Sequence, residues 1–431
     1  MVVLCPVRAW HPNAPAFDAD ELVCPVYDTL SEEDVARYGR HPFNAAQFVP
    51  RPRSVALEAF LGSAAARLRS ALREGAYVQD SRPAFYVYGI RYVPPDDIAE
   101  TMDERQRRPE YLLLGLVGCI DLAETPPEDL ALHERTFDDR VAERVALTDA
   151  TRMQFAPIMA GYHQPSHRLN DLLEDRLGLD RRGLSFEGSH PALVEARLDG
   201  TTHRLWRMDD PDEVEEIAEV VRTLRLLVLD GHHRFTAASR RAAAGRASRP
   251  LTMLVNGRDR ALAVLPWDRV LPRAVRSFPE LLAAARREFS EVTPLPRPPS
   301  VDRVIARLSE MRHTGRRGFL ASDGKEAFEV RGPPTPDAGA DFDLLHSLLE
   351  RSLRIDPHDL LFVRSPRQAF DRIASAGDPG GGGTALVLPG LTEQGIEERA
   401  FGSGAVMAHK STMFLPKVAE GVIFAPADAP G

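Results

Sequence analysis

Residues 224–245 read LRLLVLDGHHRFTAASRRAAAG, and this stretch carries the clearest structural signal in the chain. The apolar run that ends at Leu229 predicts a buried β-strand. The alanine-rich run that follows predicts an α-helix that ends at Gly245. Gly231, between the two, can adopt the backbone angles of a tight turn. The sequence therefore predicts a strand, a tight loop and a helix, with the polar pentapeptide Asp230–Arg234 at the junction.

Strand and helix patterns alternate irregularly on both sides of this stretch. Strands are predicted within 84–93, 110–122, 192–210 and 251–267, the third as a pair around an Asp-Gly turn. Helices are predicted at 31–39, 54–75, 141–153, 167–178, 211–224, 272–288, 341–353 and 366–376. The predicted class is therefore α+β, a mixed α/β fold without a repeat of fixed period.

The proline-rich segment PLPRPP at 294–299 is the clearest linker candidate, because proline-rich segments form extended spacers. We expect an N-terminal domain over 1–293 and a linker at 294–300. We expect a smaller mixed α/β domain over 301–431, packed on the first. This second domain is expected to contribute its Lys-Ser-Thr segment to a site in the first.

Composition and charge exclude several classes of protein. The 431 residues carry a formal net charge of −9, which argues against a protein that coats nucleic acid through backbone charge. No apolar run reaches the roughly 18 residues of a membrane span. The three cysteines lie too far apart for a metal pair or a disulfide framework, and the opening MVVLCPVRAW does not resemble a secretory signal. We therefore expect a cytoplasmic protein with no membrane or DNA partner; a homodimer is left open.

The pentapeptide Asp230–Arg234 combines groups that bind phosphate. Backbone N–H groups at the start of a helix are unpaired, and the helix dipole there favours an anion. Arg234 adds a planar, permanently charged fork that matches phosphate oxygens. His232 and His233 add ring donors, and Asp230 can hold Mg²⁺ or accept a proton. A helix cap with a surface arginine is the alternative interpretation of these residues.

A second cluster reads His133-Glu134-Arg135-Thr136. Its spacing is not that of a helical zinc motif. Glu134 near a phosphate site would be a natural general base for a hydroxyl group. Arg144, one helical segment later, is a candidate for a second phosphate contact. A solvated turn and a surface ion pair are the respective alternatives.

Lysine is rare in this chain, so its positions are informative. Of the 54 basic residues, three are lysines: Lys325, Lys410 and Lys417. A lysine ammonium can reach a terminal phosphate, and the hydroxyls of Ser411 and Thr412 can bind phosphate or Mg²⁺. The glycine-rich signature of a Walker loop is absent. The segment Lys410-Ser411-Thr412 is therefore a candidate phosphate-binding segment, with a solvated C-terminal turn as the alternative.

Several further residues allow more than one interpretation. Asp28 is either the N-cap of a helix that begins near Ser31 or a further carboxylate of the site. Trp206 and Trp267 are expected to pack in the core. The chain has no Ser-His-Asp order, no G-x-S-x-G elbow and no dinucleotide G-x-G-x-x-G fingerprint. Acyl transfer and hydride transfer therefore have no support.

At these residues the chain resembles the bacterial and archaeal domain-of-unknown-function family 1015. The resemblance runs along nearly the whole chain and rests on CPVRAW, LVCPVYDTLSEEDVARY, PAFYVYGIRY, LHERT, FAPIMAGY, HRLWRMDDPDEV, LVLDGHHRFTAA, LAVLPWDRVL and VMAHKSTMFLPKV. The pentapeptide is also similar to the signature of the ParB-like superfamily. That superfamily includes chromosome-partition proteins that bind nucleoside triphosphates, and free-serine kinases that use ADP or ATP.

The resemblance implies a ParB-like or serine-kinase-like fold for the N-terminal part, with Asp230–Arg234 on the nucleotide phosphates. In those kinases a separate carboxylate activates the serine hydroxyl. The resemblance does not identify that carboxylate in this chain; Glu134 is our first choice and Asp28 our second.

Three segments depart from the family's usual pattern. FDDRVAER follows HERT where the family commonly has a Gly-Pro-Lys type of stretch, and 154–158 read QFAPI in place of Asn-x-Ser-Pro-Ile. Asp268 stands where a histidine is usual. Because these segments adjoin candidate site residues, they put the substrate in question. A specialised relative that acts on a different small hydroxyl compound is one interpretation.

The leading hypothesis is a kinase that transfers phosphate from ATP or ADP, with Mg²⁺, to the hydroxyl of free L-serine or a related hydroxy amino acid. Its predicted residues are Glu134, Asp230 and His232 for catalysis, Asp230 for the metal, Gly231, His233, Arg234, Arg144, Lys410, Ser411 and Thr412 for phosphate and nucleotide, and Asp28 and His133 for the substrate. Two alternatives stay open. One is a ParB-like nucleotide-binding switch without an acceptor; the other is a metal-dependent hydrolase with ligands among His133, His203, His232, His233 and Asp230.

Overall fold

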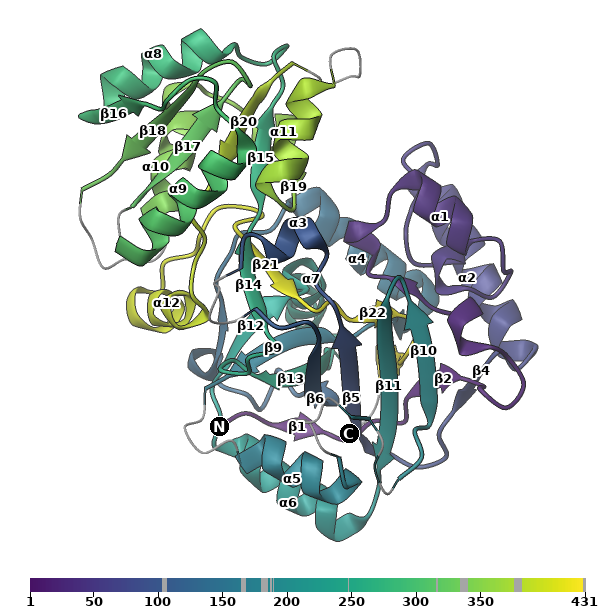
Figure 1. Cartoon of the computed structure of the whole chain (residues 1–431). Helices are drawn as coiled ribbons and strands as arrows, with labels where there is room; N and C mark the ends of the chain where they lie inside the picture. The colour runs from purple at the N-terminus through teal and green to yellow at the C-terminus, as the bar shows by residue number, and fades with distance from the viewer. Residues whose placement is uncertain are drawn as a thin grey trace.

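The computed structural model describes residues 1–102, 107–163, 168–179, 185–186, 188, 190–246, 248–314, 317–333, 340–375 and 382–428. Within these residues the largest sheet has nine strands, in the order β10-β11-β5-β6-β13-β9-β12-β7, with β1 beside β6 (Figure 1). Its strands are β1 (Leu4–Cys5), β5 (Phe85–Tyr92), β6 (Tyr111–Ile120), β7 (Leu130–Leu132), β9 (Ile158–Tyr162), β10 (Val194–Leu198), β11 (Thr201–Met208), β12 (Leu226–Asp230) and β13 (Leu251–Asn256). The fold is a mixed α and β fold, as predicted.

The strands of this sheet follow from their apolar runs. β5 and β6 pair antiparallel from Tyr86 opposite Val117 to Tyr92 opposite Tyr111, and nearly every residue of both strands is buried. Burial of both faces explains why these strands are continuously apolar rather than alternating. The predicted Asp-Gly hairpin is β10 and β11, whose turn residues both have positive φ, 45° at Asp199 and 80° at Gly200.

The helices agree with most of the predicted ranges. They are α1 (Glu32–Tyr38), α2 (Leu57–Arg73), α3 (Asp96–Ala99), α4 (Asp138–Thr151), α5 (Arg168–Leu177), α6 (Pro211–Arg222), α7 (His232–Ala243), α8 (Phe278–Glu288), α9 (Val301–Thr314), α10 (Ala340–His346), α11 (Pro366–Ala374) and α12 (Glu393–Glu397). Single helical turns occur at Ala19–Glu21, Tyr27–Thr29, Ala45–Gln47, Pro127–Asp129 and Pro357–Asp359, and π-helical turns at Ser347–Ser352 and Glu398–Ser403. Residues 167 and 376, at the ends of two predicted helices, lie outside the described residues. Of the helices described, none combines the length and the apolar character that crossing a bilayer requires.

Both faces of the large sheet are covered. On one face, α5 and α6 pack Leu169, Leu173, Ile217 and Val221 into a cluster with the strand residues Phe85 and Leu114. Another cluster joins strand residues of the sheet, such as Tyr88 and Val117, to residues of the C-terminal segment 407–425. Segment 407–425 is therefore part of the core.

A six-stranded antiparallel sheet forms the second part of the molecule, with α8, α9 and α11 around it at the top of Figure 1. Its strands are β15 (Asp268–Leu271), β16 (Glu291–Pro294), β17 (Gly318–Ser322), β18 (Ala327–Arg331), β19 (Leu361–Val363) and β20 (Thr384–Val387). Since β15 and β16 precede 294–300, this sheet begins before the predicted linker. The proline-rich segment instead connects β16 to α9 on the same sheet, because prolines mark surface turns inside a domain as well as between domains.

Short strand pairs connect the two parts and the chain ends. They are β2 (Trp10–Pro12) with β4 (Tyr77–Gln79), β3 (Cys24–Pro25) with β22 (Ala419–Glu420), β8 (Met153–Gln154) with β23 (Ala425–Pro426), and β14 (Ala263–Pro266) with β21 (Thr412–Leu415). Through β21 the C-terminal segment returns from the second sheet to the first. This return brings the Lys-Ser-Thr segment to the large sheet.

Candidate functional site

The predicted strand, loop and helix are present as β12 and α7, which meet at Gly231. All five residues of β12 are buried. Gly231 has φ of 87°, in the left-handed region, and caps α7 without any side-chain hydrogen bond. The first N–H groups of α7 therefore have no capping side chain, which leaves the positive end of the helix open to an anion.

The pentapeptide lines a small polar cavity together with residues from distant parts of the chain. The lining residues are Tyr27, Asp28, Glu134, Leu229, Asp230, Gly231, His232, His233, Arg234, Trp267, Lys410, Thr412 and Lys417. All of the residues predicted for the site are among them except His133, Arg144 and Ser411. We call this space the polar cavity.

Ion pairs join the carboxylates and cations of the polar cavity. Lys410 Nζ lies 2.9 Å from Asp28 Oδ2. Lys417 Nζ contacts Asp230 Oδ1, and Arg234 Nη2 donates to Asp230 Oδ2 at 3.2 Å. Three cations thus converge where the first turn of α7 begins.

These pairs keep both carboxylates ionised. Burial would raise the pKa of Asp28, but the charges of Lys410, Lys417 and Arg234 hold it well below its ordinary value. Burial acts on Asp230 in the same way, and so does the negative charge of Asp28. Lys417 and Arg234 nevertheless leave the pKa of Asp230 lowered. Both side chains are therefore anions at neutral pH, ready to bind a cation.

Asp28 belongs to the site and is not the N-cap of α1. It lies in the helical turn Tyr27–Thr29, and the cap of α1 is Ser31, whose hydroxyl accepts from the N–H of Asp34. The N-cap interpretation is wrong because a better cap stands three residues later.

A chain of hydrogen bonds runs behind the polar cavity. Glu134 Oε2 accepts from the N–H groups of Ser411 and Thr412, at 3.1 and 3.2 Å, and from the Thr412 hydroxyl at 3.3 Å. Thr412 Oγ1 also lies 2.7 Å from His133 Nε2, and His133 Nδ1 lies 3.3 Å from His232 Nε2. The carboxylate is thus fixed in place by the C-terminal segment.

His133 lies behind the wall of the polar cavity. It is buried and does not line the cavity, so its contact with substrate stays a prediction. Burial lowers the pKa of both His133 and His232 to about 3; the neighbouring His232 ring adds to this for His133, and His233 and the two lysines add to it for His232. Both rings are therefore neutral hydrogen-bonding groups.

Arg144 and Ser411 also lie away from the polar cavity. Arg144 Nη2 pairs with Glu143 at 2.6 Å, Nη1 donates to the carbonyl of Val49, and the guanidinium lies 4.2 Å from the ring centre of Tyr27. The Ser411 hydroxyl donates to the carbonyl three residues before it. Both side chains have other partners and do not line the polar cavity, so their phosphate contacts stay predictions.

His233 lies at the rim, where its Nε2 accepts from the N–H of Phe137 at 3.1 Å. Phe137 also stacks on His409, with ring centres 4.3 Å apart. Burial lowers the pKa of His233 to about 4, so the ring is neutral. Its predicted role as a phosphate contact would fall to the backbone N–H rather than to a ring cation.

Four lining residues were not predicted for the site: Tyr27, Leu229, Trp267 and Lys417. Lys417 carried a signal, since it is one of three lysines in the chain. Trp267 is buried, as predicted, but Lys410 Nζ lies 4.9 Å from its ring centre, which adds a cation–π contact. Tyr27 gave no signal apart from its position next to Asp28.

The donors of the polar cavity suit Mg²⁺ better than a transition metal. Within the described ranges, no group of three or more His, Cys, Asp or Glu is placed to hold a metal ion. His203, a ligand candidate for the hydrolase alternative, is buried in β11 against Tyr88 and Thr201. Asp28 and Asp230 offer hard carboxylate oxygens, and Mg²⁺ commonly takes one or two carboxylates with substrate phosphates supplying further ligands.

Two of the segments that depart from the family pattern contact residues at the polar cavity without lining it. The carbonyls of Ala156 and Pro157 accept from Arg234 Nη1 at 3.0 and 2.9 Å. Phe137 precedes α4 and holds His233 and His409, as described above. The altered segments therefore act through backbone and stacking contacts.

Asp268, the third departure, lies in β15 outside the polar cavity. It is buried, and its Oδ1 accepts from the N–H of Leu388 at 3.1 Å. Burial raises its pKa to about 7, although that N–H, Arg269 and Arg312 act in the opposite direction. Asp268 is therefore a group that costs stability once it ionises.

Replacing Asp268 should reveal this cost. Between the ordinary pKa of 3.8 and about 7, the folded state holds a proton that the unfolded state has lost, so stability falls as pH rises through that window. We expect Asp268→Asn to raise the melting temperature at pH 8 by a few degrees and to change it little at pH 4.5. Thermal unfolding at both pH values checks this. For the exposed control Asp359→Asn, the change in melting temperature relative to wild type should be the same at both pH values. If Asp268→Asn stabilises the protein less at pH 8 than at pH 4.5, the assignment is wrong.

Comparisons with known proteins complete the description of the site. A model of the family described as "Protein of unknown function (DUF1015)" matches residues 4–339. No curated protein matches the chain. Similar solved structures include a conserved hypothetical protein from Pyrococcus furiosus, with 11% identity over 68% of this chain and 90% of that chain and a TM-score of 0.39. A free serine kinase in complex with AMP shows 12% identity over 68% and 89%, with a TM-score of 0.40. SbnI with a C-terminal truncation, from Staphylococcus aureus, shows 14% identity over 69% and 82%, with a TM-score of 0.35.

Proposed function

We propose that this chain, which belongs to DUF1015, a family described as proteins of unknown function, is a phosphotransferase. It moves a phosphoryl group from ATP or ADP to the hydroxyl of a small molecule, free L-serine or a related hydroxy amino acid.

The observation that supports this proposal most strongly is the convergence of three cations on the uncapped start of α7. Lys410, Lys417 and Arg234 line the polar cavity with the N-terminal end of that helix. Arg234 Nε is buried and, among the described residues, has no hydrogen-bond partner. An unpaired buried donor costs about 1–3 kcal/mol, which a phosphate oxygen would recover. Such an arrangement suits a polyphosphate better than any neutral ligand.

The paired lysines explain how a neutral cavity can accept a charged ligand. Asp28 and Asp230 would hold Mg²⁺, which supplies charge neutralisation at the phosphates when bound. The ammonium groups of Lys410 and Lys417 are then released to bind phosphate oxygens. When a magnesium–nucleotide complex binds, each lysine–aspartate pair would thus be replaced by two contacts, one between the aspartate and Mg²⁺ and one between the lysine and a phosphate oxygen.

In the proposed reaction the acceptor oxygen forms a new bond to the terminal phosphorus as the bond to the leaving nucleotide oxygen breaks. The acceptor's hydroxyl proton passes to Glu134, and the leaving nucleotide keeps the bonding electron pair. Glu134 suits this step because its Oε2 is fixed by the C-terminal segment, while in the described part of the chain no hydrogen bond occupies Oε1. Arg234 and the first N–H groups of α7 would stabilise charge on the transferred group.

Product formation tests the function directly. The full chain is incubated with Mg²⁺, with ATP or ADP, and with each of a panel of hydroxy amino acids, and ³¹P NMR follows new phosphomonoester signals. We expect O-phosphoserine or the phosphate ester of a related compound. Nucleotide binding with slow hydrolysis and no ester from any acceptor would favour the switch alternative and contradict the proposal.

Thr412 is expected to position Glu134 rather than to bind phosphate. Thr412→Val keeps the shape of the side chain and the backbone N–H but removes the hydroxyl that joins Glu134 to His133. We expect kcat to fall about tenfold, the value of one hydrogen bond to a charged group, with the KM for nucleotide unchanged. Steady-state kinetics checks this split. The control Thr125→Val removes a buried hydroxyl far from the cavity and should leave kcat unchanged. If Thr412→Val raises only the KM for nucleotide, Thr412 binds phosphate and does not position Glu134.

A further inference from the structure

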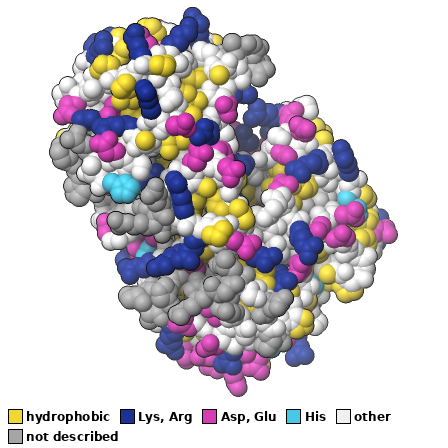
Figure 2. Space-filling view, viewed as in Figure 1, with side chains coloured by type: hydrophobic (Ala, Val, Ile, Leu, Met, Phe, Trp, Pro, Cys, Tyr) yellow, Lys and Arg dark blue, Asp and Glu magenta, His cyan; other side chains and the backbone are white. Residues whose placement is uncertain are grey.

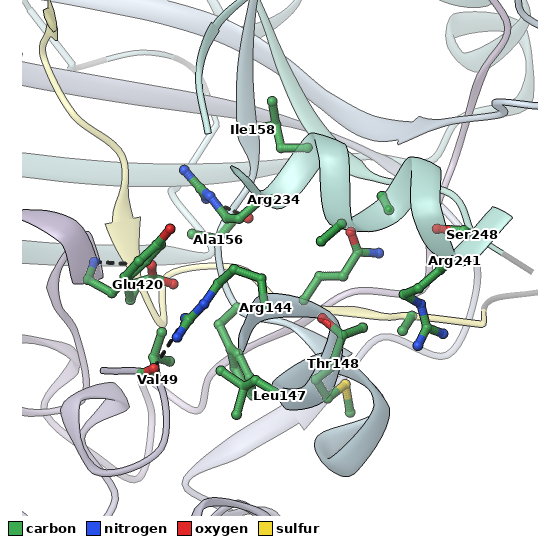
Figure 3. Close-up of a pocket in the computed structure, with 17 residues that line it drawn as sticks. Val49, Arg144, Leu147, Thr148, Ala156, Ile158, Arg234, Arg241, Ser248 and Glu420 are labelled. Atoms are coloured by element: carbon green, nitrogen blue, oxygen red, sulfur yellow. Dashed lines mark hydrogen bonds between the residues drawn. The ribbon is translucent and has the colours of Figure 1, made fainter. Parts of the chain in front are cut away.

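A second pocket shares two lining residues with the polar cavity; Figure 3 shows it, and we call it the apolar pocket. It lies between α4 and α7 and contains about 590 Å³ of space between atoms, the open solvent at its mouth included. Its lining residues are Tyr27, Val49, Arg144, Leu147, Thr148, Met153, Gln154, Phe155, Ala156, Ile158, Arg234, Ala237, Ala238, Arg241, Ser248, Glu420 and Ala427. Tyr27 and Arg234 line both spaces, so one extended ligand can occupy the two together.

Two arginines that line the apolar pocket, Arg144 and Arg241, are held in ion pairs. Arg144 pairs with Glu143, as described above. Arg241 pairs with Asp428 and Asp149 at the far end. These guanidinium groups therefore add little free charge, and the remaining wall is largely aliphatic and aromatic.

Glu420 is an acidic residue in the lining of the apolar pocket, and burial raises its pKa above the ordinary value. It is buried, accepts the N–H of Tyr27 at 3.4 Å, and within the described residues forms no ion pair. A buried carboxyl without an ion pair disfavours a ligand carboxylate. Thr148 adds a hydroxyl that has no hydrogen bond to any described residue, so a ligand's polar edge can use it.

We propose that the apolar pocket binds the nucleobase of the phosphate donor whose phosphates lie at the start of α7. The inference rests on the proposed function and names the part of the ligand that this pocket takes. A flat, uncharged heterocycle would bury its faces against Leu147, Phe155 and Ala238, and its edge could bond to Thr148 and Glu420. A free amino acid would have to bury an ammonium and a carboxylate against the same wall, which is far more costly.

Filling the pocket without touching the polar cavity tests the inference. Ala238→Leu places a larger side chain on the α7 wall, and Thr148→Leu does so from the facing helix α4. Ala243→Leu, exposed on α7, is the matched control. Calorimetry measures the binding of ATP and of inorganic tripolyphosphate, each with Mg²⁺, to the full-length wild type and variants.

We expect the wild type to bind ATP at least tenfold more tightly than tripolyphosphate. Ala238→Leu and Thr148→Leu should remove this difference and leave tripolyphosphate binding intact, while Ala243→Leu changes neither. Equal wild-type affinity for the two ligands would overturn the nucleobase pocket but spare the phosphate site. Blocked variants that still prefer ATP would overturn it too. If the wild type binds neither ligand, that result would contradict the proposed function and also the inference, which rests on it.

Discussion

Replacing Arg234 by alanine should weaken nucleotide binding about 100-fold. Arg234 lies where the polar cavity and the apolar pocket meet, and its Nε has no hydrogen-bond partner among the described residues. Charge-assisted hydrogen bonds to phosphate are worth about 1.5–3 kcal/mol, and each 1.4 kcal/mol is a factor of ten in affinity. Isothermal titration with ATP and Mg²⁺ measures the loss.

The control for this variant is Arg240→Ala. Arg240 lies on the same helix and carries the same charge, but it is exposed and pairs with Asp138. Its loss should leave affinity within about twofold, since exposed ion pairs are worth about 0–1 kcal/mol. Circular dichroism on both variants checks that α7 is intact. Equal affinities for Arg234→Ala and Arg240→Ala would show that the nucleotide does not meet Arg234.

Replacing Glu134 by glutamine should reduce phosphoryl transfer by about 10²–10⁴-fold, the usual value of general base catalysis. Glutamine keeps an oxygen that can accept the N–H groups of Ser411 and Thr412, so the loop should stay in place. Nucleotide affinity should change less than about threefold, because the carboxylate meets the acceptor and not the phosphates. The rate of ester formation and the nucleotide Kd, measured on the same preparation, give the two readouts.

Asp28→Asn separates the two candidates for the base. Asp28 is paired with Lys410, and its strongly lowered pKa makes it a poor proton acceptor. We expect this variant to weaken Mg²⁺-dependent nucleotide binding more than it slows the chemical step. A large fall in kcat for Asp28→Asn with an active Glu134→Gln would exchange their roles.

The local parts of the site could be predicted from sequence because local rules decide them. An apolar run, a glycine and an alanine-rich run specify the β12–α7 junction, and the polar residues at that junction have few structural roles. The rarity of lysine points to the C-terminal segment, and Lys410 and Lys417 both line the polar cavity. Its contact with Asp28, 382 residues away in sequence, required the fold.

The errors have physical causes that a single sequence does not reveal. Ser411 and Thr412 are adjacent, yet only Thr412 begins β21, so their side chains point to different surroundings. The Arg144 guanidinium pairs with Glu143, its direct neighbour in sequence, and does not line the polar cavity. The proline-rich segment at 294–300 predicts a boundary between domains, whereas the second sheet also takes in β15 and β16, which begin before that segment. In each case the sequence allows two interpretations, and the contacts of the folded chain decide between them.

A crystal structure of the full chain with ADP and Mg²⁺ tests the central claim most directly. The account predicts phosphate oxygens within hydrogen-bond distance of the first N–H groups of α7 and of Arg234, with Lys410 and Lys417 turned from their aspartates toward the phosphates. Phosphates bound anywhere else, with both lysines still on Asp28 and Asp230, would contradict it.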